Sequence, residues 1–184
     1  MSARAGALLL GGSSGPPPEV LTLAYPLAYA DLARQSATEN DISLLLLLSL
    51  VRQESLYDAG AVSTAQALGL TQVIPGTAAE IAGQLGQADF RNEDLFRPGL
   101  SLRFGAHYLA SQLRAFDGDL PAALAAYNAG AGNSLRWQRA AGDPNVFLES
   151  IDFPETRLYV ENVLENYARY LYAYGLLAVP SLPL

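Results

Sequence analysis

The clearest candidate for chemistry in this chain is a glutamate at the end of an apolar run. The segment Ile42–Val51 is followed by RQES, which contains Glu54. At helical spacing Glu54 continues a stripe that includes Leu47 and Leu50. Burial disfavours the charged carboxylate and raises its pKa, so this glutamate could give a proton to a leaving oxygen near neutral pH. The pattern indicates an acid catalyst; the alternative is that Glu54 only ends the helix and turns into solvent.

A polar segment follows the glutamate at a short distance. Ser63 comes nine residues later, and the run ALGLTQVIPGTA occupies residues 67–78. Gly, Pro and hydroxyl side chains favour turns and exposed hydrogen-bonding groups over regular structure. The segment could therefore form a polar wall beside Glu54, or simply connect two helices.

Composition excludes several classes of site and partner. The formal net charge is -7 and the sequence pI about 4.6, so there is no basic footprint for nucleic acid. The chain has no cysteine, and its single histidine, His107, has no nearby cysteine or histidine. Neither a disulfide nor a metal site is therefore expected. The apolar run Ile42–Val51 is too short for a membrane span, which needs roughly 20 residues.

The spacing of apolar residues predicts a single, mainly α domain with little or no β-structure. Residues 1–19 end in GGSSGPPPE and read as a flexible leader or the remnant of a larger protein. The domain is expected over residues 20–176, and residues 177–184 as an irregular tail. The leader contains only a short apolar run, below the roughly 7 to 15 residues of a secretory signal, so no export signal is assigned.

Helix boundaries follow from capping residues and breakers. The Glu54 helix should start after Asn40 or Asp41. A second helix starts near residues 75–77, with Thr77 and Glu80 at capping-box spacing and Gly86 beyond its end. Further starts are expected at Pro98, at Asp119 with Pro121, and at Pro154 with Glu155; the 119–129 helix should close at Gly130 and Gly132.

Four blocks of sequence carry a family resemblance. They are RQES at 52–55, S-x-x-x-A-x-G-L-x-Q-x-x-P-x-T-A at 63–78, AYNAGAG at 126–132 and ESIDFPETRLYV at 149–160. In order and spacing they resemble the soluble lytic transglycosylase catalytic domain, family 1, over roughly residues 24–174. The resemblance implies a lysozyme-like, multi-helix fold. It also implies cleavage of peptidoglycan between N-acetylmuramic acid and N-acetylglucosamine without water and without a cofactor.

The resemblance implies roles for nine residues. Glu54 would act as acid and then as base, with Tyr127 hydrogen-bonded to its carboxyl and orienting it. An intramolecular hydroxyl replaces water in this reaction, so no second carboxylate is required. The residues expected on the substrate side are Ser63, Gln72, Ile74, Thr77, Asn128, Glu155 and Tyr159. Tyr159 could instead belong to the core, and Arg157 is interpreted as a structural ion-pair partner.

Three positions depart from the family pattern. Gln66 stands where the family usually has glycine, and Thr71 and Ile74 stand where methionine is common. We expect Gln66 to affect a turn beside the groove, and the other two to change the apolar surface that faces the sugar. Trp137 could either stack on a sugar ring or hold a loop in place.

Two rival functions remain open from the sequence. A lysozyme-type muramidase would add a carboxylate to activate water, and Asp58 is the nearest candidate. A wall-binding domain without turnover would have lost Glu54 or the pair Tyr127–Asn128, which are all present. The expected partners are peptidoglycan glycan strands and muropeptides, met by a monomer in the cell envelope, either periplasmic or extracellular.

Overall fold

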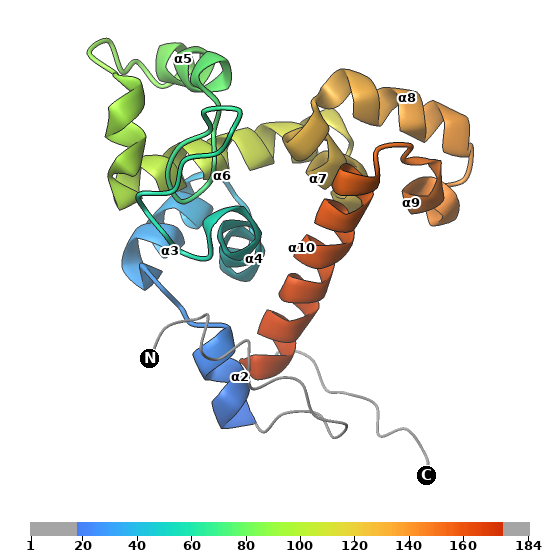
Figure 1. Ribbon diagram of the computed structural model, residues 1–184, viewed down its shortest axis with the longest axis horizontal. Coiled ribbons are helices and arrows are strands. Elements are labelled where there is room, and N and C mark those ends of the chain that lie inside the picture. Colours follow the sequence, from blue (N-terminus) through green and yellow to red (C-terminus); the bar gives the residue numbers. More distant parts are fainter. Residues whose placement is uncertain (1–17, 175–184) are drawn as a thin grey trace.

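Helices make up all the regular secondary structure that the structure, a computed structural model, describes over residues 18–174 (Figure 1). The predicted tail 177–184 and most of the predicted leader 1–19 lie outside these residues. Two isolated antiparallel bridges, Val62–Leu68 and Leu68–Val73, are the only β-pairings in the described range. The helices are α2 (Pro18–Ala24), α3 (Ala30–Glu39), α4 (Leu44–Ser55), α5 (Pro75–Gln84), η1 (Asn92–Phe96), α6 (Pro98–Ala115), α7 (Leu120–Ala129), α8 (Ala131–Ala141), η2 (Pro144–Val146), α9 (Phe147–Ser150) and α10 (Pro154–Ala173).

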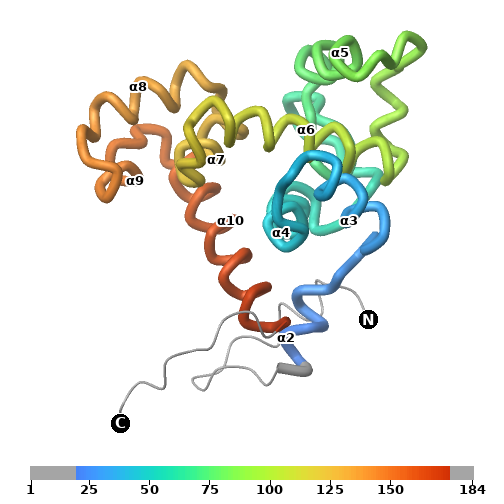
Figure 2. The backbone as a smooth tube through the Cα atoms, turned by 180° about the vertical axis from the view of Figure 1, so that it is seen from behind, coloured from blue at the N-terminus to red at the C-terminus, as the bar shows by residue number. Residues whose placement is uncertain are grey.

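Helix α4 is the central element of the fold. Its leucines are buried on opposite faces, so that Leu50 packs with α7 and α10 while Leu47 and Leu48 pack with α2, α3 and α6. Each fully buried leucine contributes about 1.5 to 3 kcal/mol, which explains why this run is apolar all round. Figure 2 shows the same arrangement from behind, with α5 at one end of the molecule and α8 and α9 at the other.

The start of α4 differs from the prediction. Ser43 is its N-cap, and the Ser43 hydroxyl accepts a hydrogen bond from the backbone N–H of Leu46 at 3.4 Å. Asn40 instead ends α3, and Asp41 has a left-handed backbone with φ of 53°. The predicted cap at Asn40 or Asp41 was wrong because these two residues form the turn between the helices.

The other predicted boundaries were partly right. Helices α6 and α10 begin at Pro98 and Pro154, and the Asp119 carboxylate caps α7 by accepting from the N–H of Ala122 at 3.2 Å. Helix α5 begins at Pro75, so the capping box at Thr77 and Glu80 does not form. Gly132 lies inside α8, a helix that the sequence did not predict because the glycines of AYNAGAG are typical of a loop.

The segment between α4 and α5 is held against the rest of the domain at several points. The Ser55 hydroxyl at the end of α4 donates to the carbonyl of Leu70 at 2.9 Å. Gly69 has φ of 74°, and a Cβ added there would lie 2.1 Å from the carbonyl oxygen of Leu95. This segment therefore has a fixed path beside the end of α4.

No helix within residues 18–174 combines the length and the apolar character that crossing a membrane requires. The longest of the helices, α10, carries charged residues along its length.

Gly69→Ala should cost far more stability than Gly86→Ala. Both glycines have positive φ, but nothing lies within 4 Å of a Cβ built at Gly86. We expect a loss of about 1 kcal/mol at Gly86 from the left-handed backbone alone, and about 2 to 4 kcal/mol at Gly69, where overpacking is added. Urea unfolding measures both variants. Equal losses would contradict the close approach of Gly69 to Leu95.

Candidate active site

Glu54 occupies the last turn of α4 and is partly buried. Burial raises the pKa of its carboxyl from 4.5 to about 7, and a hydrogen bond from the Tyr159 hydroxyl, 2.6 Å from Oε1, opposes part of that rise. A group with a pKa near 7 holds and releases a proton with comparable ease at neutral pH. Glu54 therefore does not simply end the helix and turn into solvent, and its role as an acid catalyst stays a prediction.

Tyr159, and not Tyr127, is the tyrosine that holds Glu54. The Tyr127 hydroxyl donates to the backbone carbonyl of Thr71 at 2.8 Å, and its ring lies 4.9 Å from that of Tyr108. Because that hydroxyl is already used, the predicted bond from Tyr127 to the carboxyl does not form. Tyr159 projects from α10, which packs along α4, and therefore reaches the carboxyl directly. Burial and the nearby charge of Glu54 raise the pKa of both tyrosines, so both stay neutral.

Glu54 opens into a cleft of about 590 Å³ between the 61–74 segment and the ends of α7 and α10. Eight of the nine predicted site residues line this cleft, and Tyr159 lies behind Glu54 with only 5% of its surface exposed. The cleft is lined by Glu54, Ser63, Thr64, Ala65, Ala67, Gln72, Val73, Ile74, Thr77, Tyr108, Tyr127, Asn128, Ala129, Gly130 and Glu155.

Three predicted substrate-side residues also brace the walls of the cleft. The Ser63 hydroxyl accepts from the N–H of Ala67 at 3.0 Å. The side-chain amide of Gln72 donates to the carbonyls of Ala61 and Gly69, which leaves its oxygen as the group available to a ligand. Asn128 accepts from the Thr156 hydroxyl at 2.7 Å and so ties the end of α7 to the start of α10.

The cleft continues along the start of α10. A shallower recess of about 410 Å³ shares Asn128, Ala129 and Glu155 with it and is closed by Phe153, Pro154 and Thr156. The side chain of Phe153 is 44% exposed. Together the two hollows have the form of a groove that would accept an extended ligand.

Tyr108 is the main cleft residue that sequence reasoning missed. It projects from α6 and packs against Tyr127, and burial raises the pKa of its hydroxyl. Its role depends on contact between two helices, and a tyrosine at helical spacing carries no local signal of that contact.

The structure places all three departures from the family pattern. Thr71 does not face the cleft: it is fully buried, and its hydroxyl donates to the carbonyl of Ser101 at 2.8 Å. The expectation that it alters the sugar-facing surface was wrong, because Gly105 leaves room for it inside; a Cβ at Gly105 would lie 2.4 Å from Thr71. Ile74 does line the cleft and is 46% exposed. Gln66 adopts φ of 60°, the left-handed backbone that glycine accepts more readily.

The remaining candidates have structural roles. Trp137 is fully buried in α8, and its indole N–H donates to Asp152 at 2.6 Å, so it cannot stack on a ligand. Arg157 donates to the carbonyls of Glu149 and Ile151, so its predicted ion pair was wrong. Asp58 is exposed outside the cleft and accepts from the N–H of Gly60. No cluster of three metal-ligating side chains occurs among residues 18–174.

Comparison with known proteins identifies relatives with the same architecture. The family model described as the transglycosylase SLT domain matches residues 31–148. The soluble lytic murein transglycosylase of Salmonella typhimurium is 37% identical over 155 residues, which are 82% of this chain and 24% of that protein. The chain thus spans about a quarter of the length of the curated relatives it matches.

Solved structures agree with the sequence comparison. The 70-kDa soluble lytic transglycosylase of Escherichia coli superposes with a TM-score of 0.80 at 32% identity, over 85% of this chain and 26% of that one. An inactive glutamate-to-glutamine mutant of lytic transglycosylase Slt from Pseudomonas aeruginosa gives 0.82 at 29% identity, over 95% and 28%. These similarities confirm the helical, lysozyme-like fold class.

Tyr159→Phe should raise the pKa of Glu54 above about 7. The hydrogen bond from Tyr159 stabilises the Glu54 carboxylate, and the variant loses it. Because a hydrogen bond to a charged group contributes about 1.5 kcal/mol, its loss should raise the pKa of Glu54 by about 1. Carbon-13 NMR titration of the glutamate carboxyls measures this. Tyr127→Phe is the matched control and should leave the pKa of Glu54 in place; a larger change in the control would assign the orienting role to Tyr127 after all.

Glu54→Gln should stabilise the protein at high pH. The folded-state pKa of about 7 exceeds the ordinary value of 4.5, so the folded state binds more protons between them and loses stability as pH rises through this window. At about pH 8 the free energy of unfolding of the variant should exceed that of the parent protein by up to roughly 3 kcal/mol. At about pH 4 the two should have the same free energy of unfolding. Thermal unfolding at both pH values measures the difference. The exposed Glu155→Gln is the control, and a pH-independent gain at Glu54 would contradict the explanation.

Proposed function

The chain belongs to the transglycosylase SLT domain family, and from this membership we propose that it cleaves peptidoglycan glycan strands as a lytic transglycosylase. The bond cut is the one between N-acetylmuramic acid and N-acetylglucosamine, and the product carries a 1,6-anhydro ring. The observation that carries the proposal is one partly buried carboxyl, with its pKa raised to about 7, at the edge of a groove.

In the proposed reaction Glu54 is first the acid. It gives its proton to the glycosidic oxygen as the bond from that oxygen to the muramoyl C1 breaks, and the muramoyl N-acetyl oxygen stabilises the positive centre at C1. Glu54, now a carboxylate, then takes the proton of the muramoyl 6-hydroxyl while that oxygen bonds to C1. The enzyme ends with Glu54 protonated again, and no water is consumed.

The environment of Glu54 suits both halves of this cycle. Burial favours the acid, and the Tyr159 hydroxyl stabilises the carboxylate that follows. A pKa close to the working pH lets the same group act in each direction without a large penalty. We assign Tyr159 the positioning of Glu54, and Tyr127 the support of the wall through Thr71.

A hydrolytic mechanism would need a second carboxylate to activate water. Asp58 lies outside the cleft, so it does not support that mechanism. Glu155 lines the cleft, and its side chain is exposed at the start of α10. We assign it to substrate binding, together with Ser63, Gln72, Ile74, Thr77 and Asn128.

The substrate and the relatives also bear on location and assembly. Peptidoglycan lies outside the cytoplasmic membrane, and relatives include soluble and membrane-bound lytic murein transglycosylases. We propose that the protein acts in the cell envelope, periplasmic or extracellular, as a monomer.

Glu54→Gln should abolish the clearing of purified sacculi. Loss of the general acid lowers the rate by about a hundredfold or more, whereas binding to sacculi should persist. Asp58→Asn and Glu155→Gln are the matched controls for a second carboxylate. Both should still release anhydro-muropeptides, which mass spectrometry finds lighter by one water than hydrolytic products. Full activity of Glu54→Gln, or products with only reducing-end muramic acid, would overturn the assignment.

A further inference from the structure

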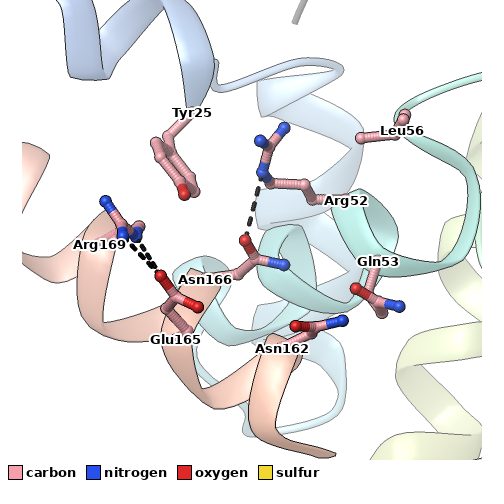
Figure 3. A pocket seen from close by; sticks show the side chains of 8 residues that line it. All are labelled: Tyr25, Arg52, Gln53, Leu56, Asn162, Glu165, Asn166 and Arg169. Carbon is pink, nitrogen blue, oxygen red and sulfur yellow. Dashed lines mark hydrogen bonds and ion pairs between the residues drawn. The ribbon is translucent and has the colours of Figure 1, made fainter. Parts of the chain in front are cut away.

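A second pocket lies along α4 and α10 and shares no residue with the cleft. It encloses about 280 Å³ and is lined by Tyr25, Arg52, Gln53, Leu56, Asn162, Glu165, Asn166 and Arg169. Figure 3 shows these side chains around one space, with Tyr25 just after α2, Leu56 just after α4, and the others on α4 and α10. The pocket has no part in the reaction described above.

Arg52 is a buried cation in the wall of this pocket. Only 7% of its surface is exposed, and its guanidinium lies 4.5 Å from the centre of the Tyr25 ring. Nε donates to Asn166 at 3.3 Å, while Nη1 is buried with no hydrogen-bond partner in the described part of the chain. A guanidinium has five N–H donors, and a buried cation with one hydrogen bond is costly. No carboxylate of residues 18–174 forms an ion pair with Arg52.

The opposite wall adds further donors. Arg169 bonds to Glu165 through Nε at 2.8 Å and Nη2 at 2.5 Å, and both bonds reach the same carboxylate oxygen. The side-chain amides of Gln53 and Asn162 face the same pocket (Figure 3). The charged groups of the wall are thus two arginines and one carboxylate, which leave a single positive charge.

We propose that this pocket binds a carboxylate, held by Arg52 and Arg169 with help from the amides of Gln53 and Asn162. A guanidinium matches the planar, two-oxygen form of a carboxylate. The net single positive charge of the wall suits a monoanion, since Glu165 would repel a divalent ion such as phosphate more strongly. The volume of about 280 Å³ accommodates a small acid or the end of a peptide.

Titration of the whole chain with sodium acetate tests the site, with chloride used to hold the ionic strength constant. The side-chain amide NMR signals of Gln53, Asn162 and Asn166 should shift and saturate together. Arg169→Gln should weaken binding about tenfold, because it removes a cation and frees Glu165. Glu165→Gln should strengthen binding several-fold by removing the like charge.

Two further variants keep the test specific. Arg139→Gln makes the same change of charge on the exposed face of α8, far from the pocket in sequence, and should leave acetate binding unchanged. Arg52→Lys keeps the positive charge but loses the paired N–H donors of the guanidinium, and should weaken acetate binding about tenfold. Far-ultraviolet circular dichroism checks that this variant is folded. Equal weakening by Arg139→Gln would reduce the effect to overall charge and overturn the proposal.

The source of the carboxylate is distinguished by three probes. Tighter binding of alanyl-alanine than of acetate, lost in its C-terminal amide, would assign the site to peptide ends. Acetate that binds as well as the peptide would assign it to small acids. Absence of saturable shifts at the three amides, or tighter binding of inorganic phosphate than of either carboxylate, would contradict the proposal. None of these measurements uses peptidoglycan, so the result is independent of the cleavage activity.

Discussion

The candidate site depends on the packing of α10 along α4, a contact that we call the seam. The seam brings Glu54, at the end of one helix, within hydrogen-bonding distance of Tyr159 on the other, although 105 residues separate them in the sequence. Burial of the α4 leucines fixes where the helix lies, and that position decides how much water reaches the carboxyl. The raised pKa of Glu54 is therefore a property of helix packing as much as of the side chain.

The features that suit Glu54 to proton transfer also reduce the stability of the folded protein. A carboxylate in an apolar seam destabilises the folded state above its pKa, and the fold accepts this because the two core clusters on either side of α4 are extensive. The Tyr159 hydroxyl limits the penalty without removing it. The same helix pair also holds Arg52, whose Nη1 is buried without a hydrogen-bond partner in the described part of the chain. Both polar groups are held in place by the surrounding apolar packing.

Local patterns predicted the parts of this molecule that depend on local physics. Periodicity identified the helix of Glu54, and proline or aspartate marked the starts of α6, α7 and α10. The motif blocks identified eight residues that do line the cleft. The errors at the site concern contacts between distant segments: Tyr159 displaced Tyr127 as partner of Glu54, and Thr71 turned inward because Gly105, on another helix, leaves space for it. Helix α8 was missed because glycines at its start resemble a loop.

The burial of Trp137 has a consequence for spectroscopy. It is the only tryptophan in the chain, and it is enclosed at the α8–α9 end of the molecule, with its indole N–H on Asp152 and the Arg136 guanidinium 5.3 Å from its ring. Its emission therefore reports on the packing around α8, including the ring of Phe153, whose centre lies 5.3 Å from that of the indole. A ligand that moves Phe153 in the recess beside the cleft would therefore change the fluorescence, as would unfolding that begins at α8.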